Sequence, residues 1–391
     1  MRKFTGLLFR CFLYSVIVVM FAASSIPVNN STFTDLDKAG LFSEISSLEN
    51  FTVVVRVWGN ISNEGSEPLY LNETDILVFE YPLNTGDQRV YSVKAWVNDA
   101  EYDYVLVNES GNTYLVINYP EANTSLDPGE SISVGVEYVV GINRTKRIYS
   151  VLDFQIVDDP YKLLDKAGNW TDLVEANTTM GNYTSITGLW NYTHPLIRLV
   201  YKYIERKLVA NNPLGYLLGV LEWISESIIY STRVPARHPW ETIIEGSGDC
   251  DDQSNLLITL LRASGIPSYL EIGFVYIHEN YYFKDEEANG YYIYEFRGGG
   301  GHGWVVAYIP PWGWIRVDPV VGSLGPLPRV AIKYALYYIK PTIVAERIVR
   351  EDYVIETARA VETIESRKIK MHLVIEMHSL SETTQSPQYT S

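Results

Sequence analysis

Cysteine is nearly absent from this sequence, which has only Cys11 and Cys250 among its 391 residues. Cys11 lies in an apolar run near the N-terminus, so Cys250 has no second cysteine in the remainder of the chain. A single cysteine can form neither an intramolecular disulfide nor half of a cysteine-rich zinc site. Two roles remain for Cys250, a small buried apolar residue or a reactive thiol.

Positive charge is the second shortage. The 31 lysine and arginine residues face 47 aspartate and glutamate residues, which gives a net charge of −16 and an isoelectric point near 4.9. A nucleic-acid partner would require a basic face, so this composition argues against one. The hydrophobic fraction of 47% is ample for a core, and the length predicts two domains with tails.

The surroundings of Cys250 indicate the N-terminus of a helix. A glycine-rich turn ends at Asp249, and Gly265 followed by Pro267 ends the helix that begins there. Leucines recur on one face of this helix, at positions 256, 257, 260 and 261. Unpaired N–H groups and the positive end of the helix dipole lie at such an N-terminus. We therefore expect a lowered thiol pKa and hydrogen-bond donors for an oxyanion.

Acidic residues flank Cys250 at positions 249, 251 and 252. Burying Asp249, Asp251 and Asp252 unpaired would be costly, which favours a nucleophilic cysteine over a core-filling one. A calcium site made of these three residues and Asp318 is an alternative. The loop lacks the alternating acids and the bidentate glutamate of an EF-hand, so we expect no metal and no other cofactor.

A predicted hairpin carries a histidine that could activate the thiol. Residues 301–308 alternate like a half-buried strand, residues 310–313 form a turn, and residues 314–319 form the returning strand. Folding about this turn brings His302 close to Asp318, because antiparallel neighbours on one face lie side by side. Packing of the Cys250 helix on this sheet would assemble a nucleophile, a base and a residue that orients the base.

Several motifs follow one another in a set order: Gly-Asp-Cys250, Leu-Leu-Arg-Ala-Ser-Gly-Ile-Pro267, His302-Gly-Trp304 and Trp314-Ile-Arg-Val-Asp318-Pro319. This set resembles the transglutaminase-like superfamily of papain-like cysteine enzymes, over about residues 195–324. The resemblance implies Cys250 as nucleophile, His302 as base and Asp318 as the residue that orients it. Ser268-Tyr269 stands where the family often has Ala-Arg, and a tyrosine-rich stretch precedes His302, so the substrate groove is unassigned.

Acyl transfer through a thioester on Cys250 is the chemistry expected of this triad, with a protein or peptide as substrate. The backbone N–H of Cys250 is the expected oxyanion donor, and Trp240 is a candidate for the second. Water as acceptor would make the protein an amidase or peptidase, and an amine would make it a cross-linking transglutaminase. We favour hydrolysis, because an amine requires its own pocket. The alternative is a non-catalytic cell-surface binding or scaffold protein; the oligomeric state is open.

Residues 1–28 form a predicted targeting segment. Arg2, Lys3 and Arg10 precede an apolar run at residues 11–23, and small residues follow it, as at a signal-peptide cleavage site. A cleaved signal peptide and a single membrane anchor both stay open. The basic start places the remainder of the chain outside the membrane, so we expect an exported protein, extracellular or at the cell surface.

The expected fold class is α+β, with a papain-like transglutaminase-type core preceded by an N-terminal β-sandwich. Short strand-like runs separated by turn signals fill residues 29–150 and predict the sandwich. Polar residues 151–194 are expected to link it to the catalytic domain at residues 195–325. That domain opens with predicted helices at about residues 196–204 and 217–229.

The C-terminal region is predicted to close the fold. Within residues 326–380, residues 331–365 are expected to be mainly helical and residues 369–377 to form a strand. Residues 381–391 are expected to be a disordered tail.

Acceptor sequences for N-glycosylation, Asn-x-Ser/Thr, crowd the first half and stop before the catalytic motifs. Chance produces such sites in turns, but the abrupt stop favours a glycosylated, outward-facing domain. The asparagines are Asn30, Asn50, Asn60, Asn72, Asn108, Asn123, Asn143, Asn169, Asn177, Asn182 and Asn191.

Residues 276–297 are rich in tyrosine and are followed by four glycines at residues 298–301. We interpret the stretch as a long hairpin with aromatic cross-strand pairs. The alternative is a flap over the groove, hinged at the glycines. His238 and His278 are rival bases, but neither is followed by a strand, turn and strand that carry an aspartate. Metal-ligand partners at a useful spacing are also missing for His372 and His378.

Overall fold

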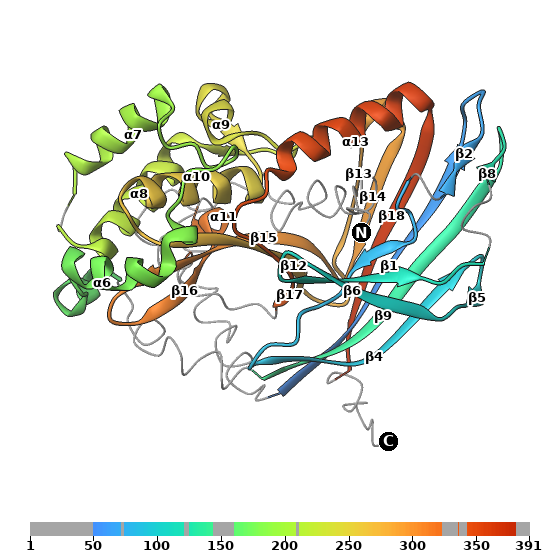
Figure 1. Ribbon diagram of the computed structural model, residues 1–391, viewed down its shortest axis with the longest axis horizontal. Helices are drawn as coiled ribbons and strands as arrows, with labels where there is room; N and C mark the ends of the chain where they lie inside the picture. The colour runs from blue at the N-terminus through green and yellow to red at the C-terminus, as the bar shows by residue number, and fades with distance from the viewer. Residues whose placement is uncertain are drawn as a thin grey trace, which may run out of the picture.

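A β-sandwich and a second, helix-covered sheet make up the described chain in the computed structural model (Figure 1). The description covers residues 50–380 except 72–73, 121–124, 144–159, 209–210, 323–334 and 336–341. The predicted targeting segment at residues 1–28 and the predicted tail at 381–391 lie outside it. No helix of the described ranges is long and apolar enough to cross a bilayer.

The larger sheet of the sandwich is built around β1 (Asn50–Asn63), which buries alternate side chains such as Val53 and Val55. It pairs antiparallel with β9 (Ser131–Asn143) on one side and with β18 (Ile369–Ser379) on the other. The other strands of this sheet are β4 (Gln88–Val97) and β5 (Ala100–Glu101) beyond β9, and β14 (Tyr292–Arg297) and β13 (Tyr282–Glu287) beyond β18.

A smaller sheet packs against the larger one. Its strand order is β3 (Val78–Glu80), β7 (Asn112–Ile117) and β6 (Tyr104–Glu109). Tyr138 of β9 crosses between the layers, because its hydroxyl donates to the carbonyl of Glu80 at 2.8 Å and its ring packs edge-on against Tyr81. The short strands β2 (Leu69–Tyr70) and β8 (Ser125–Leu126) pair at one end.

The expected fold class is confirmed, but the sandwich is not made by residues 29–150 alone. β18 matches β1 along its length, from Val53 opposite Ser379 to Asn63 opposite Ile369. β14 runs parallel to β18 on the far side. Without these later strands one edge of β1 would be unpaired, and exposed edges are a liability that sheets avoid. Strands β13, β14 and β18, which come late in the chain, therefore complete the sandwich.

The second sheet has the order β16 (Gly313–Val317), β15 (Gly299–Ile309), β12 (Ser268–Tyr276) and β17 (Thr342–Ile348). Helix α10 (Cys250–Ala263) packs on β15 and β12 and is buried along almost its entire length. The helices around α10 in Figure 1 are α7 (Pro195–Glu205), α8 (Pro213–Ser227), α9 (Pro239–Glu245) and α11 (Pro319–Gly322).

One sequence prediction is wrong in this region, and so is one alternative, the flap hinged at the glycines. Residues 342–348 form strand β17 rather than helix, because this run begins with the β-branched Thr342, Ile343 and Val344 and fits the buried edge of β12. The four glycines are not a hinge either. Gly298 has a φ of +72°, and a Cβ there would stand 2.0 Å from the carbonyl oxygen of Met377, so the glycine lets the chain pass from β14 directly into β15.

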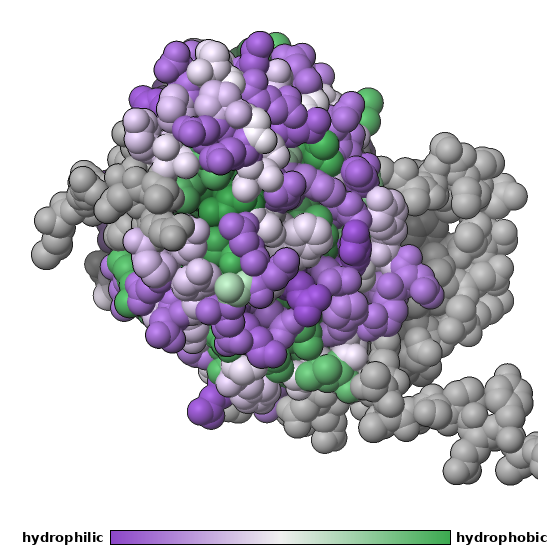
Figure 2. Space-filling model, turned by 90° about the vertical axis from the view of Figure 1, so that its right-hand side faces the viewer, coloured by the Kyte–Doolittle hydropathy of each residue, from purple (hydrophilic) through white to green (hydrophobic). Residues whose placement is uncertain are grey.

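The predicted hairpin at residues 276–297 is confirmed as β13 and β14. The link at residues 151–194 contains α6 (Trp170–Met180), which Asn169 caps. Helix α13 (Tyr353–Arg367) runs from the helices around α10 across to the sandwich (Figure 1). The sandwich end of the molecule is mainly hydrophilic, with apolar surface gathered near its middle (Figure 2).

Candidate active site

The local sequence places Cys250 at the first residue of α10, as predicted. Gly246 ends α9 in the left-handed conformation, with a φ of +64°. Asp249 then caps α10, because its side chain accepts a hydrogen bond from the backbone N–H of Asp252 at 3.4 Å. Gly265, with a φ of +87°, follows the end of the helix.

The side chain of Cys250 contacts strand β15 at Gly303, the residue that follows His302. This side chain is 1% exposed, and the backbone N–H of Gly303 donates a hydrogen bond to its sulfur. One turn along the helix, the hydroxyl of Ser254 donates to the carbonyl of Gly303 at 3.4 Å. These two contacts hold the start of α10 against the strand that carries His302.

His302 and Asp318 lie in direct contact. Nε2 of His302 is 2.6 Å from Oδ2 of Asp318, and both side chains are buried. The other carboxylate oxygen of Asp318 accepts the N–H of Val320 at 3.2 Å. In the strand register Val305 stands opposite Val317, so the contact is diagonal rather than directly across the ladder. The predicted meeting of this histidine and this carboxylate is confirmed.

The expected low thiol pKa is contradicted. Burial raises the pKa of the Cys250 thiol well above its ordinary value, and the carboxylates of Asp249, Asp251 and Asp318 raise it further. The N–H of Gly303 opposes this shift without cancelling it. Burial and the neighbouring acids therefore favour the neutral thiol of Cys250.

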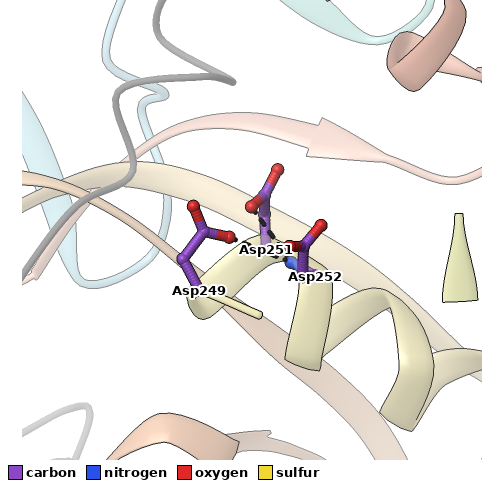
Figure 3. A group of neighbouring side chains, drawn as sticks. All are labelled: Asp249, Asp251 and Asp252. Atoms are coloured by element: carbon purple, nitrogen blue, oxygen red, sulfur yellow. Dashed lines mark hydrogen bonds between the residues drawn. The ribbon is translucent and has the colours of Figure 1, made fainter. Parts of the chain in front are cut away.

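The three flanking acids are buried, although burying such groups without partners is costly. Asp249, Asp251 and Asp252 converge at the start of α10, with one oxygen of each within 4.8 Å of the others (Figure 3). Arg237 compensates part of this charge. Its Nη2 and Nε lie 2.7 and 3.0 Å from Oδ2 of Asp252, and its backbone N–H donates to Oδ1 at 2.8 Å.

Asp251 has more hydrogen-bond donors than Asp249. It accepts the hydroxyl of Tyr353 and the N–H of Asp252, both at 3.0 Å, whereas Asp249 accepts the same N–H at 3.4 Å. Burial raises the pKa of both carboxyl groups, and that of Asp249 is raised well above its ordinary value. Hydrogen-bond donors stabilise the ionised form, so they oppose this rise in pKa more strongly at Asp251 than at Asp249.

Asparagine at position 249 or 251 tests the effect of these two acids on the thiol. Asp249→Asn and Asp251→Asn each remove a carboxyl group that raises the pKa of the Cys250 thiol, so that pKa is expected to fall by about one to two units in each variant. Thiolate absorbance against pH measures both variants. An unchanged thiol pKa in both variants would contradict this role of the two acids.

The calcium alternative requires Asp318 beside the three acids of α10. The structure places Asp318 on His302 instead, and the guanidinium of Arg237 already supplies a positive charge to Asp252. The four-carboxylate arrangement is therefore not assembled.

The ring of Trp240 is stacked against the rings of His194 and His238, at centroid distances of 5.0 and 4.4 Å. The rival base His238 pairs with Asp352 at 3.4 Å. Although burial opposes it, Asp352 and Glu241 raise the pKa of His238.

The other histidines considered from sequence lie away from these contacts. His278 packs against Tyr281, His372 pairs with Glu295 at 3.2 Å, and His378 pairs with Glu279 at 3.3 Å.

Some residues that build the site had no sequence signal. Arg237 lies upstream of Cys250, and Tyr353 lies in a helix about a hundred residues downstream. Trp304, within a motif, donates from its indole to Glu271 at 2.9 Å, and Arg316 and Arg347 bind the same carboxylate. Although burial alone would raise it, these arginines hold the pKa of Glu271 below its ordinary value.

Comparison with known proteins identifies the core. Residues 203–319 match the model of the transglutaminase-like superfamily, which confirms the predicted resemblance for that segment. The uncharacterized protein YebA of Bacillus subtilis (strain 168) is 34% identical over 79 residues, which are 20% of this chain and 10% of YebA. The chain therefore spans about a tenth of the length of that relative.

Solved structures with related folds have low sequence identity. A candidate cysteine protease from Cytophaga hutchinsonii is 13% identical with a TM-score of 0.45, over 88% of this chain and 94% of that one. The periplasmic domain of TgpA from Pseudomonas aeruginosa, bound to ethylmercury, is 15% identical with a TM-score of 0.31, over 72% and 93%.

Proposed function

Starting from the transglutaminase-like core at residues 203–319, we propose that this protein is a cysteine enzyme that cleaves an amide or peptide bond through a thioester on Cys250. One observation carries the proposal. Nε2 of His302 and Oδ2 of Asp318 form a buried pair, 2.6 Å apart. The next residue after His302 is Gly303, whose backbone N–H binds the sulfur of Cys250. Such a set of groups can activate a nucleophile.

His302 acts as a base through its second ring nitrogen. When Nε2–H donates to Asp318, Nδ1 carries the lone pair that accepts the thiol proton. Because burial favours the neutral thiol, proton transfer accompanies attack of the sulfur on the substrate carbonyl carbon. The negative charge then moves to the carbonyl oxygen, for which the backbone N–H of Cys250, at the positive end of α10, is the proposed donor.

The intermediate collapses when His302 returns its proton to the leaving nitrogen and the C–N bond breaks. This step leaves the acyl group on Cys250 as a thioester. Water then attacks the thioester carbon and gives a proton to His302, and that proton returns to the sulfur as the S–C bond breaks. The products are a carboxylic acid and an amine, and the free thiol is restored.

Hydrolysis is the reaction that we favour over cross-linking. Water is present at every site, whereas an amine acceptor requires a pocket that holds and desolvates it. A protein or peptide is the proposed substrate class, because the scissile bond of this chemistry is an amide.

Export is part of the proposal. The basic and apolar segment at residues 1–28 supports it, as do Asn-x-Ser/Thr sites whose asparagines are exposed at Asn60, Asn108, Asn169 and Asn182. Asn30, Asn72 and Asn123 lie outside the described residues. The choice between a cleaved signal peptide and a membrane anchor stays open.

A peptide library tests the reaction type. We expect the purified protein to release new amino termini from some library members, and we expect Cys250→Ala to release none. Adding a primary amine should divert part of the acyl group only if an acceptor pocket exists. Hydrolysis that persists in Cys250→Ala, or amine products that dominate over acid products, would contradict the proposal.

A further inference from the structure

The outer face of α7 carries an unbalanced row of cations in an acidic chain. Arg198, Lys202 and Arg206 follow one another at intervals of four residues, so they lie along one ridge of the helix, and all three are exposed. Within the described residues, no carboxylate forms an ion pair with any of them. This isolation is notable because the chain as a whole has a net charge of −16.

A second ridge lies directly beside the first. Leu199 is 65% exposed and Tyr203 is 46% exposed, and Lys207 follows four residues later. The ammonium of Lys207 lies over the ring of Tyr203, 4.4 Å from its centroid. Cations and exposed apolar groups are therefore interleaved on one surface.

The core does not explain this surface. α7 packs into the protein through Ile197, Val200 and Ile204, on its opposite face. Like charges four residues apart destabilise a helix, and Glu205, the only acid of the helix, already accepts the hydroxyl of Tyr201 at 3.3 Å. A negatively charged partner would relieve the repulsion between Arg198, Lys202 and Arg206.

We propose that this surface, the α7 face (Arg198, Leu199, Lys202, Tyr203, Arg206 and Lys207), docks on an anionic lipid bilayer. Charge complementarity attracts the four cations to acidic headgroups. Leu199 and Tyr203 favour a bilayer over an acidic protein, because a leucine and an amphipathic ring between long basic side chains match the boundary between headgroups and acyl chains. α7 lies at the outer edge of the molecule, far from the sandwich (Figure 1).

Docking through the α7 face has a consequence for the active site. α7 packs against α10, the helix that begins with Cys250. A bilayer bound to α7 would therefore hold the catalytic core at the membrane surface and favour substrates within reach of that surface. The consequence rests on the proposed function, whereas the docking itself does not.

Chemical labelling of lysines tests the proposal on the full chain. The N-terminal apolar segment would by itself hold the chain on vesicles, so the readout must be local to α7. We expect acetylation of Lys202 and Lys207, followed by mass spectrometry, to slow several-fold on phosphatidylcholine vesicles that contain phosphatidylglycerol, relative to phosphatidylcholine alone. Lys284, which is exposed on β13, is the control whose rate should not change.

Two sets of variants distinguish binding through the α7 face from an effect of the net charge of the protein. Arg198→Gln, Lys202→Gln and Arg206→Gln combined should weaken anionic-vesicle binding of the α7 face by about 100-fold, since each cation contributes a factor of about five. Because Lys202 is replaced in that variant, the measured quantity is the acetylation rate of Lys207. Lys94→Gln, Lys284→Gln and Lys370→Gln combined change the net charge equally and should leave protection of Lys202 and Lys207 intact.

Two outcomes would overturn the proposal. In the first, Lys202 and Lys207 react equally fast with and without the anionic lipid. In the second, poly-aspartate protects them while anionic vesicles do not, which would assign the face to an acidic protein. Neither outcome depends on catalysis, so failure of the docking proposal would leave the proposed function untouched.

Discussion

Replacement of His302 by alanine is expected to lower kcat/KM for an amide substrate by about 10²–10⁴-fold, the usual contribution of a general base. The structure makes this loss large because burial holds Cys250 as a neutral thiol. Without the imidazole, the thiol loses the base that Asp318 orients. KM should change little, because the imidazole acts on the reacting bond rather than on the bound substrate.

Asp318→Asn extends this first prediction. The amide can still contact the imidazole, but its NH₂ group would favour a proton on the wrong ring nitrogen. We expect kcat to fall while the fold is retained, because Oδ1 can still accept the N–H of Val320. His278→Ala is the matched control, since His278 makes a ring contact with Tyr281 at 6.2 Å and is expected to matter little. A His302→Ala variant as active as His278→Ala would refute the assigned role.

Arg237→Met is expected to lower the free energy of unfolding by about 3–5 kcal/mol, because it leaves a buried carboxylate without its counter-charge. The side chain of Arg237 is 7% exposed and that of Asp252 is fully buried. Methionine keeps most of the apolar volume, so the effect reports the lost charge rather than a cavity. Denaturant unfolding of the variant and the wild type measures the difference.

The loss in Arg237→Met should depend on pH in a defined direction. The pKa of Asp252 is raised to about 7, mainly by burial and also by Asp251, while Arg237 opposes the rise. A carboxyl group whose pKa is raised by folding stabilises the native state at low pH and loses that contribution as pH rises through the native value. Removing Arg237 raises the native pKa further. The deficit should therefore be smaller at pH 5 than at pH 8.

Arg233→Met is the matched control for this prediction. Both Arg237 and Arg233 pair with Glu245. The pair of Arg233 with Glu245, at 2.7 Å, joins two side chains that are substantially exposed. Exposed ion pairs contribute about 0–1 kcal/mol, so this variant should be close to wild type. A deficit that is equal in the two variants, or that grows as pH falls, would contradict the role assigned to Arg237 and Asp252.

The sequence was sufficient for the parts of the site that local rules govern. Helix periodicity and the glycine before and after it located Cys250 at the start of α10. The turn at residues 310–313 implied a hairpin, and a hairpin implies which residues meet, so the contact between His302 and Asp318 followed. The helices α7 and α8 and the closing strand β18 were recoverable from periodicity alone.

Features that depend on long-range packing were not recoverable. No local pattern shows that β18 would pair with β1, or that Tyr353 would reach Asp251. The prediction of a low pKa for the Cys250 thiol was wrong for the same reason. A helix N-terminus lowers this pKa, but burial and three acidic residues, of which Asp318 follows β16, outweigh that effect. Burial itself is set by how the sheet and helices meet, and periodicity does not report that.

Direct observation of the thioester tests the central claim. The measurement is the intact-protein mass, followed in time after adding p-nitrophenyl acetate to wild type, Cys250→Ala and His302→Ala. We expect one acetyl group on Cys250 in the wild type that disappears by hydrolysis, no such adduct in Cys250→Ala, and formation at least about 100-fold slower in folded His302→Ala. Equal acylation of wild type and His302→Ala, or an adduct at another residue, would contradict the proposed mechanism.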